Sequence, residues 1–162
     1  MPSPVTIDDH STPVGLMGAW LFNYAVTHRA VQAGHDGTVH LSPTDTVQPD
    51  VMLWKTGGNA RVGSDRFLEG APELVVEVAA SSVVYDLHSK KESYRRAGVL
   101  EYIDWRTLDH QIDWFRLLDG KYEQVMPDEE GTVVSTVFDG LRLNLPRMLL
   151  GDASAILPPP LT

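Results

Sequence analysis

Apolar residues recur at helical spacing in two segments of the chain, and the first of these lies near the N-terminus. Thr12-Pro13 is a favourable helix start, and apolar residues follow it at steps of three and four. The pattern predicts a first helix over residues 13–33, ended by Gly34. Within it, Gly15 and Gly18 lower the helix propensity by up to about 1 kcal/mol each, which predicts close packing at those positions.

The second helical segment runs from about Asp86 to Ala97 and is closed by Gly98. The other regular segments are β-rich, and Asp119-Gly120 between two of them is a hairpin signal. Strands are predicted over residues 37–41, 47–54, 74–79, 100–105, 111–118 and 121–125, with short edge pieces at 133–138 and 141–143. A glycine-rich loop is expected over 56–70 and a helical turn over 146–150.

The order of these elements predicts an α+β fold, with one mixed sheet flanked by helices and additional antiparallel strands toward the C-terminus. We expect residues 1–150 to form a single domain. Residues 151–162 contain three consecutive prolines and are expected to be a mobile tail.

Composition narrows the class of protein. The chain has 162 residues, 43% of them hydrophobic, which is typical of one folded domain. It has no cysteine, so thiolate metal sites, cysteine nucleophiles and disulfides are excluded, and we expect a cytoplasmic location. No apolar run approaches the ~20 residues of a membrane span, and no signal peptide is expected. A net charge of −9 argues against coating nucleic acid by bulk charge but leaves room for a local basic groove.

Three polar residues interrupt patterns that otherwise indicate burial. Glu77 breaks the nearly continuous apolar run of residues 74–79, Lys90 occupies the inward position of the second helix, and Asp50 starts a strand after Pro49. Each has a plain alternative: a solvated face of an edge strand for Glu77, a lysine stem extending to solvent for Lys90, and a Pro-Asp turn for Asp50. Together they predict a site for a hard cation, Mg²⁺ or Mn²⁺, with a positive group beside it.

The sequence around these residues resembles the PD-(D/E)XK nuclease superfamily and, within it, the Uma-two family of restriction-endonuclease-like proteins. The resemblance covers about residues 1–150. Its motifs are Gln48-Pro49-Asp50-Val51, Pro72-Glu73-Leu74-Val75-Val76-Glu77-Val78, Asp86-Leu87-His88-Ser89-Lys90, Tyr94-Arg95-Arg96-Ala97-Gly98-Val99 and Glu101-Tyr102.

The resemblance implies a restriction-endonuclease-like core, in which Asp50 and Glu77 bind the metal ion and Lys90 is the catalytic lysine. The wider superfamily places its lysine two residues after the second acid, which is Ala79 here. The family that the chain resembles carries the lysine on the following helix, as Lys90 does. The family's N-terminal hairpin, with its Glu-Leu-Ile-Asp-Gly-like stretch, has no counterpart that we find in this sequence.

The function that this resemblance implies is Mg²⁺-dependent endonucleolytic hydrolysis of DNA, with DNA as partner and a homodimer as the oligomeric state. Lys91, Arg95 and Arg96 are candidates for phosphate contacts, or else an ordinary solvated helix face. The alternative function is a catalytically inactive nuclease-fold module that binds nucleic acid or protein. The acidic net charge favours this alternative, whereas the set of Asp50, Glu77 and Lys90 favours the enzyme.

Overall fold

The computed structural model describes residues 6–80 and 84–157, and its centre is a six-stranded mixed sheet. The strand order is β1-β4-β7-β8-β9-β10, and only the β7–β8 pair is parallel. The strands are β1 (Val31–His35), β4 (Val51–Lys55), β7 (Leu74–Ala79), β8 (Glu101–Arg106), β9 (Gln111–Leu118) and β10 (Lys121–Gln124). Helix α2 (Val84–Ala97) makes the crossover that the parallel pair requires.

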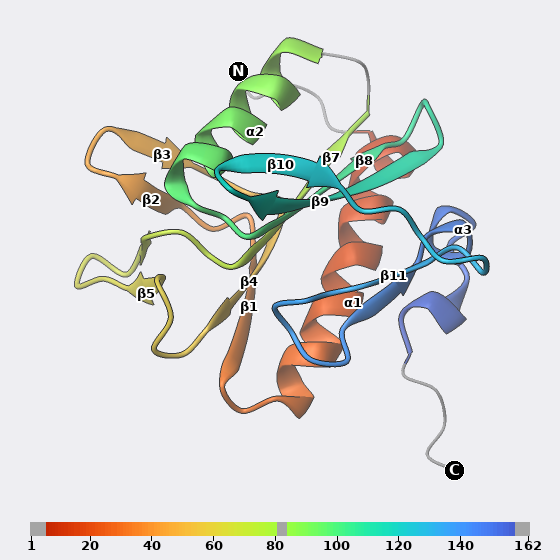
Figure 1. Cartoon of the computed structure of the whole chain (residues 1–162), viewed down its shortest axis with the longest axis horizontal. Helices are drawn as coiled ribbons and strands as arrows, with labels where there is room; N and C mark the ends of the chain where they lie inside the picture. Colours follow the sequence, from red (N-terminus) through yellow and green to blue (C-terminus); the bar gives the residue numbers. More distant parts are fainter. Residues whose placement is uncertain (1–5, 81–83, 158–162) are drawn as a thin grey trace.

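One helix covers each face of this sheet (Figure 1). Helix α1 (Thr12–Thr27) packs Met17 and Leu21 against Val76 and the other residues of one core cluster. Helix α2 packs Tyr94 with Val75 in the second cluster, on the opposite face. Successive residues of β7 therefore face different helices, which explains the nearly continuous apolar run in its sequence.

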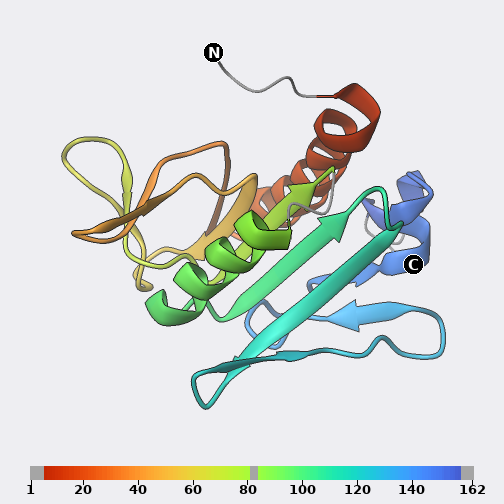
Figure 2. The ribbon, with the colours of Figure 1, turned by 90° about the horizontal axis from the view of Figure 1, so that it is seen from above.

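Smaller elements surround this core, and Figure 2 shows them at the two sides of the main sheet. A four-stranded sheet has the order β3-β2-β6-β5, and β11 pairs with β12. Their bounds are β2 (Val39–Ser42), β3 (Asp45–Val47), β5 (Arg61–Val62), β6 (Leu68–Glu69), β11 (Thr132–Val134) and β12 (Arg142–Asn144). The short helices are η1 (Ile7–Ser11), α3 (Leu145–Leu149) and η2 (Ala153–Ala155).

The predicted α+β class and mixed sheet are confirmed, but the first helix is shorter than predicted. It ends at Thr27 because His28 is extended, with a φ of −127° and a ring nitrogen 2.8 Å from the carbonyl oxygen of Tyr24. The segment after it is strand β1, in which Gly34 pairs with Met52 of β4 and does not cap a helix. The prediction of close packing at Gly15 and Gly18 is also wrong, because a Cβ at either position would meet none of the described atoms within 4 Å.

Two further boundaries differ from the sequence pattern. The strand predicted over 47–54 divides into β3 and β4, and the loop predicted over 56–70 contains β5 and β6. The tail expected from residue 151 contains η2, whose Ala155 packs in the main core, while residues 158–162 lie outside the described part of the chain. In the described ranges, no helix is long and apolar enough to cross a membrane.

Candidate active site

Asp50 and Glu77 face each other at the point where β4 and β7 meet. The two strands are antiparallel with Val51 opposite Val76, so Asp50, just before β4, lies level with Glu77. Directly opposed residues of antiparallel strands share one face of the sheet. Here that face is the one covered by α2. The backbone N–H of Val78 donates to Oδ2 of Asp50 over 2.7 Å and fixes the carboxylate there.

Glu77 is buried and held by two residues of α2. Its side chain is 3% exposed, because β7 lies inside the sheet between β4 and β8 and not at its edge. Lys90 donates from Nζ to Oε2 over 3.0 Å, and the Tyr94 hydroxyl donates to Oε1 over 2.5 Å. Lys90 thus directs its ammonium toward the sheet, although a third of its side chain is exposed.

Burial dominates the ionisation of both carboxyls. It raises the pKa of Glu77 to about 7, although the neighbouring Lys90 ammonium opposes the shift and the Asp50 carboxylate adds to it. Burial also raises the pKa of Asp50, against the hydrogen bond from the Val78 N–H and the nearby Lys90 ammonium. A cation bound between the two carboxylates would stabilise their ionised forms.

The donor set suits a hard divalent cation. Two carboxylates from neighbouring strands supply oxygen ligands, and Mg²⁺ commonly takes one or two carboxylates and completes its shell with water and substrate phosphate. Within residues 6–80 and 84–157 no group of three or more His, Cys, Asp or Glu side chains is placed to hold a metal ion. Asp50 and Glu77 alone would therefore hold Mg²⁺ or Mn²⁺ in this part of the chain.

His10 is a residue of this site that the sequence analysis missed. Its Nε2 lies 3.5 Å from Oδ1 of Asp50. The segment that carries it is fastened to the sheet, because the Thr107 hydroxyl donates to the carbonyl of Asp9 over 2.8 Å and the Thr107 N–H donates to Ala79. The apolar periodicity begins only after Thr12, so no signal in the sequence connected residue 10 with residue 50.

Two further buried acids lie beside Asp50 and Glu77, so that four carboxyl groups form a row across neighbouring strands of the sheet. Asp104 of β8 is level with Glu77, and Asp113 of β9 is level with Asp104. Arg106 donates to both, over 3.2 Å and 2.7 Å. Burial raises the pKa of Asp104 to about 6 despite this guanidinium. Both acids interrupt buried apolar strands as Glu77 does, and the same reasoning from the sequence would have found them.

The basic residues predicted to meet phosphate contact other groups of the chain. Lys91 lies with Nζ 3.1 Å from the centroid of the Phe115 ring, and burial lowers its pKa. Arg95 pairs with Glu92 over 2.6 Å, and Arg96 lies 3.9 Å from Asp45. Phosphate binding by Lys91, Arg95 and Arg96 stays a prediction.

Comparison with known proteins relates this chain and its fold to nucleases. The family model described as "Uma2: Putative restriction endonuclease" matches residues 1–146. The crystal structure of a protein from Anabaena variabilis ATCC 29413, described as a putative nuclease belonging to DUF820, has a TM-score of 0.71. It is 13% identical over 96% of this chain and 85% of that one, and it confirms the predicted restriction-endonuclease-like core.

A second solved structure is the type IIG restriction endonuclease BpuSI, with a TM-score of 0.48 and 14% identity. The match covers 96% of this chain but 18% of that one, and we draw no argument from it. No curated protein matches the chain significantly.

Proposed function

The chain belongs to the Uma2 family of restriction-endonuclease-like proteins, and from this we propose that it is a metal-dependent endonuclease that hydrolyses phosphodiester bonds of DNA. The observation that carries the proposal is the meeting of Asp50, Glu77 and Lys90 beneath helix α2. Two buried carboxylates and an ammonium at one place are what phosphodiester hydrolysis needs: a cation site and a positive group beside it.

In this proposal Asp50 and Glu77 hold Mg²⁺ or Mn²⁺. When bound, such an ion lowers the pKa of a coordinated water and neutralises charge on the phosphate. The protein's own contribution is orientation. The Val78 N–H occupies one oxygen of Asp50 and the Tyr94 hydroxyl one oxygen of Glu77, so a cation would take the other oxygen of each carboxylate in place of its present neighbour, His10 at Asp50 and Lys90 at Glu77.

In the proposed mechanism Lys90 acts on the attacking water and on the phosphate. Its ammonium lies on Glu77 now and would turn toward the attacking water or the phosphate when a cation takes that carboxylate oxygen. There it orients the water and stabilises the negative charge that develops on the phosphate in the transition state. We propose DNA in the cytoplasm as the substrate, and the homodimer stays a prediction.

A catalytically inactive module is the second candidate. Lys91, Arg95 and Arg96 contact groups of the chain itself, and the net charge is −9. Both features weaken binding to a polyanion. Of the two roles that such an inactive module could have, binding protein or binding nucleic acid, these features favour binding protein.

Plasmid cleavage with Mg²⁺ or Mn²⁺ tests the proposal on the wild type, Lys90→Ala and the control Lys121→Ala, an exposed lysine of β10. Lys90→Ala should lose about 10²–10⁴-fold in rate, whereas Lys121→Ala should cleave like the wild type. Cleavage by Lys90→Ala at the wild-type rate would show that this lysine is not catalytic. Failure of the wild type with both metal ions would favour the inactive module.

A further inference from the structure

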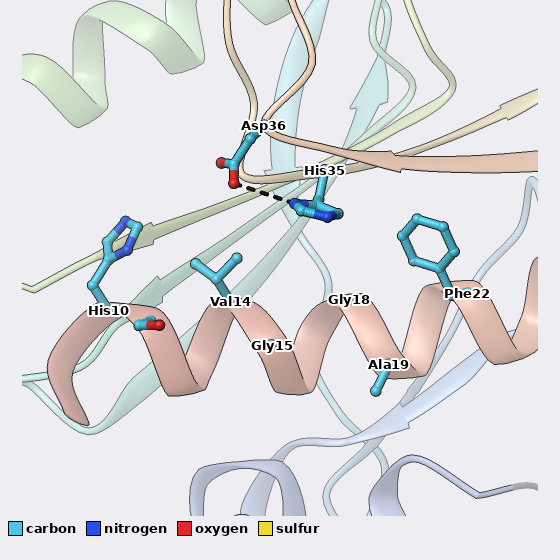
Figure 3. A pocket seen from close by; sticks show the side chains of 9 residues that line it. His10, Val14, Gly15, Gly18, Ala19, Phe22, His35 and Asp36 are labelled. Carbon is cyan, nitrogen blue, oxygen red and sulfur yellow. Dashed lines mark hydrogen bonds and ion pairs between the residues drawn. The ribbon is translucent and has the colours of Figure 1, made fainter. Parts of the chain in front are cut away.

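A groove of about 650 Å³ lies between one face of helix α1 and the end of strand β1 (Figure 3). Gly15 and Gly18 form part of its floor, and Phe22 projects from the helix near one end. Across from the helix are His35 and Asp36. The two glycines keep the groove open. A Cβ added at Gly15 or Gly18 would meet no described atom within 4 Å, so a larger side chain there would extend into the empty space of the groove.

This groove reaches the candidate active site. His10 lines its other end, and the Nε2 of His10 is 3.5 Å from Oδ1 of Asp50. The backbone N–H of Asp36 donates to the carbonyl oxygen of the same Asp50 over 3.2 Å. A strand whose phosphate lies at Asp50 and Glu77 would therefore be able to continue past His10 and along the groove toward Phe22.

The lining of the groove suits a base better than a phosphate. Phe22 is 38% exposed, and the largely exposed ring of His35 stands 6.2 Å from it at an interplanar angle of 69°. Aromatic faces of this kind stack with bases, each stack contributing roughly 1–3 kcal/mol. Among the described residues the lining contains no lysine or arginine, and the carboxylate of Asp36 would repel phosphate.

The distribution of charge points away from intact duplex DNA. Duplex binding depends largely on lysine and arginine contacts to phosphates. On α2 those residues contact the chain's own groups, Arg95 with Glu92 and Arg96 near Asp45. A substrate held partly by stacking needs fewer such contacts, but its bases must be unstacked, as they are in a single strand.

We propose that this groove binds an unstacked base of the strand that is cleaved, further along that strand than the cleaved phosphate, so that the substrate is single-stranded DNA in preference to duplex. The inference rests on the proposed nuclease function and names the substrate of the same site. Phe22 supplies the stacking face, the ring of His35 lies beside it at a steep angle, and Gly18 supplies the space that the base occupies.

Fluorescence anisotropy with Ca²⁺ in place of Mg²⁺ tests this without cleavage. The probes are a fluorescein-labelled oligodeoxythymidylate and the same strand annealed to oligodeoxyadenylate. Phe22→Ala should weaken binding of the single strand about 5- to 150-fold, which corresponds to the loss of one stacked base. Gly18→Leu should weaken it by filling the groove. The control Val26→Ala, one turn further along α1 and 78% exposed, should bind like the wild type.

Other results of these experiments would contradict either the base-binding groove or the nuclease function. Base binding by the groove would be refuted if the wild type bound duplex and single strand equally. It would also be refuted if Phe22→Ala and Gly18→Leu, with unchanged melting temperatures, both bound the single strand like the wild type. In either case the proposed nuclease function would still hold if the wild type cleaved DNA and Lys90→Ala did not. Single-strand binding that depends on Phe22, without cleavage in Mg²⁺ or Mn²⁺, would refute the nuclease alone. A dimer in sedimentation that Phe22→Ala dissociates would instead assign the groove to a second copy of the chain.

Discussion

Replacing Glu77 by glutamine should make the protein more stable at high pH and leave it almost unchanged at low pH. The folded state raises the pKa of this carboxyl to about 7, from an ordinary value of 4.5. Between these two values the folded protein binds more protons than the unfolded chain. The free energy of unfolding of the wild type should therefore fall as the pH rises through this window. Glutamine keeps the shape of the side chain but cannot ionise.

The size of the effect follows from the difference of pKa. At ~1.36 kcal/mol per unit, the change from 4.5 to about 7 corresponds to an upper limit of about 3 kcal/mol, most of it developed between about pH 5 and pH 8. The side chain is 3% exposed, so solvent screens this cost little. The ion pair with Lys90 already opposes the shift in the wild type.

Urea unfolding at several pH values, without divalent metal, measures the difference in free energy of unfolding between wild type and Glu77→Gln. Titrating groups that do not interact with Glu77 cancel in this difference. The matched control is Glu92→Gln on the exposed side of α2, where the Arg95 guanidinium holds the pKa of Glu92 below its ordinary value. Its difference from the wild type should stay nearly constant from about pH 5 to pH 8. A Glu77→Gln difference that is equally flat, or that shrinks with rising pH, would refute the assignment of a buried carboxyl with a raised pKa.

Two other predictions concern the cation site and the end of α2. Mg²⁺ at 100 times its dissociation constant should stabilise the wild type by about 2.7 kcal/mol, and Asp50→Asn should abolish most of the resulting increase in melting temperature; equal increases in both proteins would place the ion elsewhere. Gly98→Ala should lower the free energy of unfolding by about 1 kcal/mol in urea, because Gly98 has a φ of +87°, which alanine adopts only with strain. No described atom lies within 4 Å of the added Cβ, so this backbone strain should account for the whole effect. An unchanged midpoint would show that the strain is relieved.

The parts of the fold that were predicted correctly are those whose signals are local. The periodicity of α2 and its glycine stop, with the Gly98 N–H bonded to the carbonyl of Tyr94, are properties of neighbouring residues. The hairpin at Asp119-Gly120 is another, since β9 and β10 pair directly around it. Strand β1 was assigned to a helix because its conformation depends on pairing with β4, some twenty residues further along the chain. Periodicity within a window does not contain that information.

The candidate site divides in the same way. Glu77 and Lys90 each contradicted a local pattern, and the structure brings their charged groups to 3.0 Å. His10 contradicts no pattern, because the residues around it have none. Its position beside Asp50 depends on Thr107, nearly a hundred residues away in the sequence, holding the N-terminal segment against the ends of β7 and β8.

The line of four acids across the sheet indicates why a cation would bind at one end of it. Asp104 and Asp113 lie at the end where the Arg106 guanidinium already bridges them, at 3.2 Å and 2.7 Å, and where the Lys91 ammonium favours the ionised form of Asp104. A divalent ion there would have to displace a bidentate arginine contact, which costs the desolvation of a guanidinium as well as its hydrogen bonds. At the other end the only lysine or arginine that ion-pairs with Asp50 or Glu77 in the described residues is Lys90, a flexible ammonium whose side chain is one third exposed and can rehydrate when it leaves. The same row of carboxylates therefore has one end that Arg106 neutralises and another end where burial raises the pKa of both carboxyls, so that a bound cation would favour their ionised forms.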